Sequence, residues 1–277
     1  MKQSRIRILT ECSILIALAS VLSVIKLVDM PYGGSVTPAA MLPILLFAYR
    51  HGTKWGLGCA TVYAVVQQLL GLENLTYFSS WQSVVGIIVL DYVVAYAAVG
   101  LGGIFRRVEK NQSLALFYGA ILVCLIRYLC HVISGAILWA EYDFAFPEGA
   151  TVIYSISYNA TYMLPEAIIL SAAAIYIGSV LDFSHVIPAR VRMEKADRAV
   201  TVCRLAGGIL SLFAAVFAVV TVSPALQDPE SGEFTLTLLG ELNWAVIAPV
   251  FCAAIVAAVV LFLVSYLREK NNLVRGN

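Results

Sequence analysis

Polar and aromatic side chains recur every four residues in an otherwise apolar stretch that contains HVISGAILWAEY. Arg127, His131, Gly135 and Trp139 follow one another at this spacing, which places them on one face of a helix. Gly135 leaves a gap between two large rings on that face. The gap accepts either a neighbouring helix or a ligand, and small residues at helix interfaces are common in membrane proteins. Both interpretations stay open on spacing alone.

A second polar stretch, IYSISYNATYMLPE, follows in the next apolar segment. Tyr154, Tyr158 and Tyr162 recur every four residues, and Asn159 lies beside them. Tyrosines near a helix end are common anchors at the membrane surface, but the amide of Asn159 needs hydrogen-bond partners away from lipid. Pro165 cannot donate a backbone hydrogen bond and is expected to kink its helix. These groups indicate a polar interior in this segment.

Three charged residues, Asp91, Arg127 and Glu166, lie deep within apolar segments. A charge near the bilayer centre costs at least about 2.5–3.5 kcal/mol on insertion scales, so each one needs a partner or a function. If all three share one cavity, its balance is one net negative charge. Carboxylate, amide, phenol and indole groups together suit a small planar cation with hydrogen-bonding edges. Arg127 is able to pair with either carboxylate, and the sequence does not decide between them.

Catalysis has weaker support than binding. An intramembrane enzyme with His131 and Asp91 as acid and base is the alternative, but a histidine beside Ser134 does not by itself make a triad. The sequence contains no GxxxxGK[ST] phosphate loop and no HExxH zinc motif. Its six cysteines form no CxxC pair and are expected to be buried thiols. We therefore expect no metal, no cofactor and no enzymatic activity.

The composition places all of these residues within a membrane. The 277 residues are 61% hydrophobic and 13% charged, against about 45–50% and about 25% in soluble domains. A bilayer span needs about 20 mostly apolar residues. We therefore predict an all-α integral membrane protein with eight membrane-spanning helices near 9–28, 38–50, 55–72, 82–105, 113–139, 152–182, 203–223 and 245–267.

Basic residues are concentrated on one side of these predicted spans. Of the 18 Lys and Arg residues, all except Lys26 and Arg127 fall on one face if the chain crosses eight times. The opposite loops carry acidic residues and no arginine. The positive-inside rule then predicts a multi-pass protein of the bacterial cell membrane with both termini cytoplasmic. A net charge of +1 argues against nucleic acid as a partner.

Five motifs occur in order along the first two thirds of the chain. They are LTECSILIALASVLS, MPYGGSVTPAAMLPILLFAYRHGTKWGL, LDYVVAYAAVGLGGIFRR, RYLCHVISGAILWAEY and YSISYNATYMLPE. Together they resemble the thiamine-specific substrate-binding components (S components) of energy-coupling factor (ECF) transporters, the ThiT family. The resemblance implies a six-helix S-component core at 1–183. A basic cytoplasmic linker at 184–202 and a further transmembrane helix pair of unknown role at 203–277 would follow it.

The resemblance also implies a set of ligand-binding residues. Asp91 with Tyr92 would help to bind the aminopyrimidine of thiamine or of a close analogue, and Trp139 would stack on the ligand. The whole implied set is Trp81, Asp91, Tyr92, His131, Gly135, Trp139, Tyr154 and Asn159. A related vitamin or a thiamine precursor is the alternative ligand within this class.

The chain departs from the family pattern at two places. Some relatives have a glutamate where Asp91 stands, so the carboxylate here is one methylene shorter. Some also close the pocket with a tryptophan in the loop after the first helix, where this chain has DMPYGGSVTP. Tyr32 is the candidate substitute, and Gly33 and Gly34 would let this loop act as a lid.

The resemblance further implies partner subunits. S components hydrolyse nothing themselves, and they deliver the vitamin through a membrane coupling (T) subunit driven by two ATPases. Docking in the family uses an AxxxA pattern on the first helix, where small residues allow close approach. The nearest match here is degenerate and consists of Ser13, Ala17, Ala19 and Ser23. A purely structural membrane subunit, in which Asp91, Asn159 and Trp139 pair with one another, is a third possibility.

Overall fold

The computed structural model describes residues 5–30, 33–138, 150–183, 185–190, 198–226 and 237–275. Within these ranges the chain consists of helices, two short antiparallel hairpins (β1 with β2 and β3 with β4), and the turns and loops between them. Six described helices are long and apolar enough to cross a membrane: Arg5–Val24, Trp81–Arg107, Gln112–Ile137, Val152–Val180, Ala199–Val222 and Trp244–Glu269. The prediction of an all-α integral membrane protein is confirmed, and the protein crosses the membrane several times.

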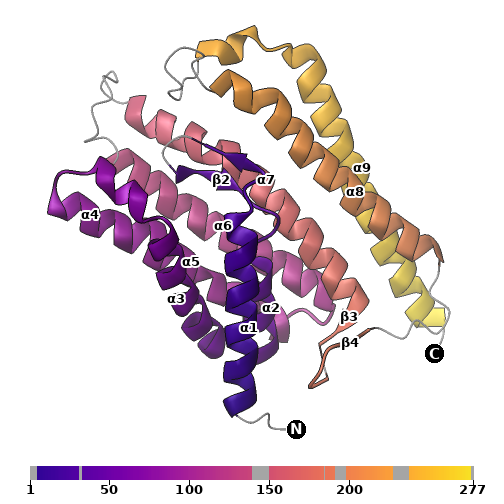
Figure 1. Ribbon diagram of the computed structural model, residues 1–277. Helices are drawn as coiled ribbons and strands as arrows, with labels where there is room; N and C mark the ends of the chain where they lie inside the picture. Colours follow the sequence, from indigo (N-terminus) through magenta and orange to yellow (C-terminus); the bar gives the residue numbers. More distant parts are fainter. Residues whose placement is uncertain are drawn as a thin grey trace.

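Figure 1 shows how the elements are arranged. The first group is α1 (Arg5–Val24), β1 (Val28–Asp29), β2 (Ser35–Val36), α2 (Leu42–His51), α3 (Thr53–Leu70) and the 3-10 helix η2 (Leu72–Tyr77). The fourth long helix consists of α4 (Trp81–Ile87), the π-helical η3 (Ile88–Val94), α5 (Ala95–Ala97) and the 3-10 helix η4 (Ala98–Arg107). The rest are α6 (Gln112–Ile137), α7 (Ala150–Val180), β3 (Leu181–Asp182), β4 (Ala189–Arg190), α8 (Arg198–Val222), η6 (Ser223–Leu226), η7 (Thr237–Glu241) and α9 (Trp244–Arg275).

The second predicted span, 38–50, is shorter in the structure than expected. α2 has ten residues, which at about 1.5 Å per residue covers about half of a hydrocarbon core of roughly 30 Å. Pro43 occupies its first turn, where the missing backbone N–H breaks no helical hydrogen bond. Gly52, with a φ of +86°, ends the helix and turns the chain directly into α3. The prediction of a full span at 38–50 is therefore wrong, although the chain still reverses direction after α2.

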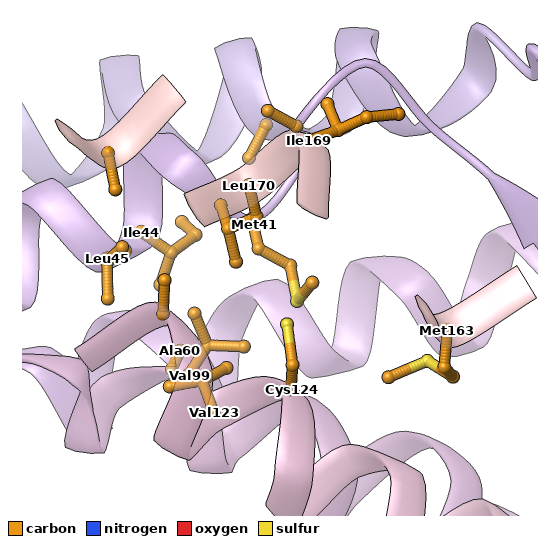
Figure 2. Close-up of a cluster of buried hydrophobic side chains, with 14 of the residues drawn as sticks. Met41, Ile44, Leu45, Ala60, Val99, Val123, Cys124, Met163, Ile169 and Leu170 are labelled. Atoms are coloured by element: carbon orange, nitrogen blue, oxygen red, sulfur yellow. The ribbon is translucent and has the colours of Figure 1, made fainter. Parts of the chain in front are cut away.

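The short α2 helix lies in the centre of the apolar core. Its residues Ile44, Leu45 and Phe47 are fully buried, as a helix surrounded by others requires. Figure 2 shows the α2 side chains gathered with Val99 of η4, Val123 and Cys124 of α6, and Ile169 and Leu170 of α7. This core fixes α6 and α7 relative to the start of α2 and to the loop that precedes it.

The last two helices form a hairpin on the outside of this core. α8 lies along α7, and α9 packs on α8 (Figure 1). Ala214 and Ala215 are fully buried in this layer, and Gly207 lets Phe262 come close. Both ends of the chain lie at one end of the molecule, which we call the terminal end, and the β1–β2 hairpin lies toward the opposite end, which we call the hairpin end (Figure 1).

Candidate functional site

A π-helical segment in the helix that runs from Trp81 to Arg107 carries Asp91. η3 spans Ile88–Val94, and such wide turns inside α-helices occur frequently at functional sites. Oδ1 of Asp91 lies 2.9 Å from Nδ1 of His131, and the hydroxyl of Ser134 donates to Oδ2 at 2.8 Å. An ionised carboxylate accepts both contacts when His131 carries its proton on Nδ1. The π-helical turn and α6 thus hold one carboxylate in a defined position inside the membrane.

The same contacts bear on the enzymatic alternative. A nucleophile–base relay requires the serine hydroxyl to bond to the histidine, whereas Ser134 and His131 both bond to Asp91. Among the described residues, no group of three or more His, Cys, Asp or Glu side chains is arranged to hold a metal ion. The geometry is that of an anchored carboxylate.

Gly135 brings α6 and α7 into close contact. A Cβ at this position would collide with Oγ of Ser155 and lie 3.5 Å from Nδ2 of Asn159. Nδ2 of Asn159 donates to the carbonyl of Ser155 at 2.8 Å and to that of His131 at 3.3 Å. The hydroxyl of Tyr162 donates to Oδ1 of Asn159 at 2.5 Å. The gap left by Gly135 therefore receives α7, and the Asn159 amide links the two helices.

This close contact makes a prediction about Gly135→Ala. Because the new methyl group would force Ser155 away, we expect a loss of about 1–3 kcal/mol of stability, the usual cost of overpacking. Gly58→Ala is the matched control, since a Cβ there meets nothing within 4 Å in the middle of α3. Thermal unfolding followed by size-exclusion chromatography should show a lower midpoint for Gly135→Ala only. Equal midpoints for the two variants would contradict the close helix contact.

Arg127 pairs with Glu166 and not with Asp91, the two carboxylates between which the sequence did not decide. Nη1 of Arg127 lies 3.1 Å from Oε2 of Glu166, and both side chains are 5% exposed. The hydroxyl of Thr37 donates to Oε1 of Glu166 at 2.7 Å, and the guanidinium carbon lies 4.5 Å from the centre of the Tyr96 ring. The two opposite charges of this pair therefore compensate each other, whereas Asp91 contacts His131 and Ser134 instead of Arg127.

A small polar cavity of about 70 Å³ lies next to this ion pair, and Arg127 and Glu166 form part of its wall. Among the described members of the implied ligand-binding set, His131 alone lines it. The other polar lining groups are Ser23, Ser35, Thr37, Tyr63, Gln67, Tyr96, Arg127, Tyr162 and Glu166. Tyr63 and Gln67 were not expected at the site, although their spacing of four residues on α3 is the signal of a polar helix face. Among the described residues, Nε2 of His131 has no hydrogen-bond partner.

The loop from Gly33 to Met41 covers the cavity. Gly33 has a φ of +97°, a conformation that glycine adopts without strain. The backbone N–H of Gly34 donates to the hydroxyl of Tyr158 at 3.3 Å, and a side chain at Gly34 would collide with Tyr162. The loop therefore packs directly on the tyrosine face of α7. Tyr32 lies outside the described residues.

The other described members of the implied set do not line the cavity. The hydroxyl of Tyr92 donates to the carbonyl of Gly71 at 3.1 Å and accepts from Asn74 at 2.9 Å. Tyr154 stacks on Tyr158 with ring centres 6.1 Å apart. Trp81 begins α4 and is 71% exposed. Trp139 lies outside the described residues.

The four residues expected to dock a partner divide between two faces of α1. Ser13 and Ala17 lie on the exposed face. Ala19 is 0% exposed, and Ser23 accepts a hydrogen bond of 2.9 Å from Gln67 at the polar cavity. Ala19 and Ser23 thus face the interior of the protein.

Comparisons with known proteins agree with this architecture. The family described as "Thiamine transporter protein (Thia_YuaJ)" matches residues 9–183. "Thiamine transporter ThiT" of Bacillus subtilis (strain 168) is 36% identical over 173 residues, which cover 58% of this chain and 84% of that protein. The "Uncharacterized protein YybS" of the same organism is 31% identical over 135 residues, which cover 48% of this chain and 38% of that protein.

A solved structure has the same fold. ThiT from Listeria monocytogenes superposes with a TM-score of 0.52 at 22% sequence identity, covering 64% of this chain and 95% of that chain. The family match spans more than half of this chain, and its relatives are named as transporters rather than enzymes. The chain therefore belongs to the thiamine transporter family of ThiT-type S components.

Proposed function

We propose that the protein captures thiamine, or a close analogue, at the hairpin end and acts as the substrate-binding subunit of an ECF-type importer. The observation that carries this proposal is the carboxylate of Asp91, held inside the membrane by His131 and Ser134. It supplies negative charge for a cationic ligand and hydrogen-bond acceptors for the aminopyrimidine of thiamine. The family match over residues 9–183 supports the same ligand.

The surrounding side chains suit the flat rings of such a ligand. In this proposal Trp139 stacks on the ligand, while Tyr154 and Asn159 offer hydrogen bonds from α7. Gly135 keeps α6 and α7 close enough for both helices to reach the same ligand. Trp81 at the start of α4 and Tyr92 on the π-helical turn complete the set.

Binding requires the start of the loop from Gly33 to Met41, at Gly33 and Gly34, to move outward, while Val36 to Met41 stay buried in the core. Binding sites for ligands of this size usually measure about 300–1,000 Å³, whereas the polar cavity enclosed by the described residues is about 70 Å³. Gly34 is held by its N–H bond to the Tyr158 hydroxyl, at 3.3 Å, and by the Met30 N–H, which donates to its carbonyl at 2.7 Å. Gly33 and Gly34 give the start of the loop the backbone freedom of a lid.

The first test of this proposal is a thiamine titration of the detergent-purified protein, followed by its intrinsic tryptophan fluorescence. We expect saturable quenching at sub-micromolar thiamine, which corresponds to about −8 kcal/mol or better. The Trp139→Phe variant should lose most of the signal, while Trp55→Phe, on the partly exposed face of α3, should keep it. No quenching, confirmed by calorimetry, would exclude thiamine. A panel of vitamins and of thiamine's pyrimidine half would then identify a related ligand.

Coupling to a T subunit and two ATPases is proposed through the exposed face of α1. Ser13 and Ala17 are small residues on this face, next to large apolar side chains such as Ile14 and Val21. Small residues let a partner helix approach closely. We expect Ala17→Trp to abolish co-purification with the partner subunits while thiamine binding is kept. Val256→Trp, on the exposed face of α9, is the control. If Ala17→Trp still co-purifies with the partner subunits, the docking surface does not include this face of α1.

The proposed orientation places both termini in the cytoplasm of a bacterial cell. The two ends of the chain share the terminal end of the molecule (Figure 1). Arg50, Arg106, Arg107 and Arg204 also lie near the helix ends on this side, as the positive-inside rule requires. Thiamine would then enter from outside the cell, at the hairpin end. The proposed core is 1–183, with the linker at 184–202 and the helix pair at 203–277 added to it.

A further inference from the structure

A second cavity lies between α7, α8 and the β1–β2 hairpin. It measures about 220 Å³, about three times the polar cavity. Val28 and Val36 line it from the hairpin, Leu164 and Pro165 from α7, and Ala218 from α8. Because α8 lies beyond residues 9–183, this cavity is made in part by the C-terminal helix pair that the family match does not include.

The lining of this cavity is almost entirely apolar. Ten of its eleven lining residues are apolar, and the remaining one is Thr161. The Thr161 hydroxyl donates to the carbonyl of Tyr158 at 2.7 Å, so its methyl group is left for the cavity. No charged side chain is among the described lining residues. A polar ligand would lose its hydrogen bonds to water here without gaining others.

The position of the cavity determines what fills it. α7 and α8 both have the length and composition of membrane spans, so the space between them opens onto lipid hydrocarbon rather than onto water. An apolar cavity of this size stays dry and accepts hydrocarbon. A lipid chain gains no hydrophobic free energy on moving from bilayer to cavity. It gains the dispersion contacts that the lining atoms otherwise lack.

We propose that this cavity binds one acyl chain of a phospholipid from the leaflet at the hairpin end, and that the chain braces the β1–β2 hairpin. The hairpin strands are two residues each, joined at Val28–Val36 and Asp29–Ser35, and such a short hairpin has little stability of its own. Val28 and Val36 form the cavity wall on this side, so a chain in the cavity supports the hairpin against α7 and α8. The C-terminal helix pair thereby supplies a lipid-binding site next to the loop that covers the polar cavity.

The test uses the full chain in phosphatidylcholine nanodiscs that contain a small fraction of phosphatidylcholine with a diazirine on one acyl chain. After irradiation, labelled peptides are identified by mass spectrometry, without thiamine. We expect label at 160–168 and 218–222 in excess of label on the lipid-exposed face of α9 around Val259 and Val260. Equal labelling of the cavity and the exposed face would mean surrounding bilayer lipid only and would overturn the proposal.

Two variants make the test specific to the cavity. Ala218→Trp fills the cavity and should reduce label at 160–168 several-fold, whereas Val220→Trp, on the exposed face of α8, should leave it unchanged. If Ala218→Trp does not fold, Ala160→Leu fills the same space from α7. Unchanged label in the filled variant would overturn the proposal. The result is independent of thiamine binding, which is measured on separate samples.

Discussion

Replacing Glu166 with glutamine should lower the apparent midpoint of thermal unfolding by roughly 10 °C, a larger loss of stability than any other single change proposed for this protein. The substitution keeps the size of the side chain but leaves the charge of Arg127 buried and unpaired. Breaking a buried ion pair in this way costs about 3–5 kcal/mol, and each kcal/mol shifts the midpoint by about 2–4 °C in a protein of this size. The Thr37 hydroxyl loses an anionic acceptor in the same step.

One control for this prediction removes both charges of the buried pair, and the other breaks an exposed pair. Arg127→Met combined with Glu166→Gln should be less destabilised than Glu166→Gln alone, because no buried charge is left unpaired. Asp29→Asn breaks an exposed pair with Lys26, which costs at most about 1 kcal/mol. Midpoints measured by fluorescence-detected size-exclusion chromatography rank the variants. If Glu166→Gln unfolds at the same temperature as Asp29→Asn, the Arg127–Glu166 pair does not stabilise the helix bundle.

The sequence predicted the long helices well because their apolar length is a local property. It failed at 38–50, where α2 is apolar because most of it is buried in the protein core, but is only ten residues long. Burial inside protein and burial inside lipid select the same side chains. The glycine at position 52, which ends α2 with a φ of +86°, was the local signal that this segment stops early.

The partners of the buried charges could not be read from the sequence. Asp91, Arg127 and Glu166 lie on three different helices, and their pairing depends on helix rotation and depth. Both are set by core packing around α2 and by the π-helical turn at Ile88–Val94. That turn has no sequence signature, yet Asp91 projects from it toward α6. Spacing on a single helix identified polar faces but gave no information on which faces meet.

The spacing of Gly135 allowed two interpretations, a neighbouring helix or a ligand in the gap, and the structure shows the neighbouring helix. The glycine receives α7, as a packing residue would, because Ser155 occupies the space of its missing side chain. The same contact places Asn159 within hydrogen-bond distance of the His131 carbonyl. The close approach of α6 and α7 at Gly135 therefore also brings the polar side chains of the two helices together.

The second prediction with a large effect concerns Asp91→Asn. Asparagine keeps the shape of the side chain but removes the charge that would accept hydrogen bonds from the aminopyrimidine of the cationic ligand. The loss of a charged interaction in a buried site is worth about 3 kcal/mol, which weakens the Kd for thiamine by roughly 100-fold. Calorimetric titration of the purified variant gives the Kd directly. The unfolding midpoint of the same sample shows whether the contacts to His131 and Ser134 are still made.

Two further aspartate variants separate charge from geometry. Asp91→Glu keeps the charge on a chain one methylene longer, as in some relatives, and should bind thiamine far more tightly than Asp91→Asn. Asp182→Asn removes a carboxylate at the terminal end of the molecule, in β3, and should leave the Kd unchanged. An unchanged Kd in Asp91→Asn would remove this residue from the site. If Asp91→Glu binds as poorly as Asp91→Asn, the π-helical turn positions the carboxylate so closely that length matters as much as charge, and the pocket is built for the shorter side chain.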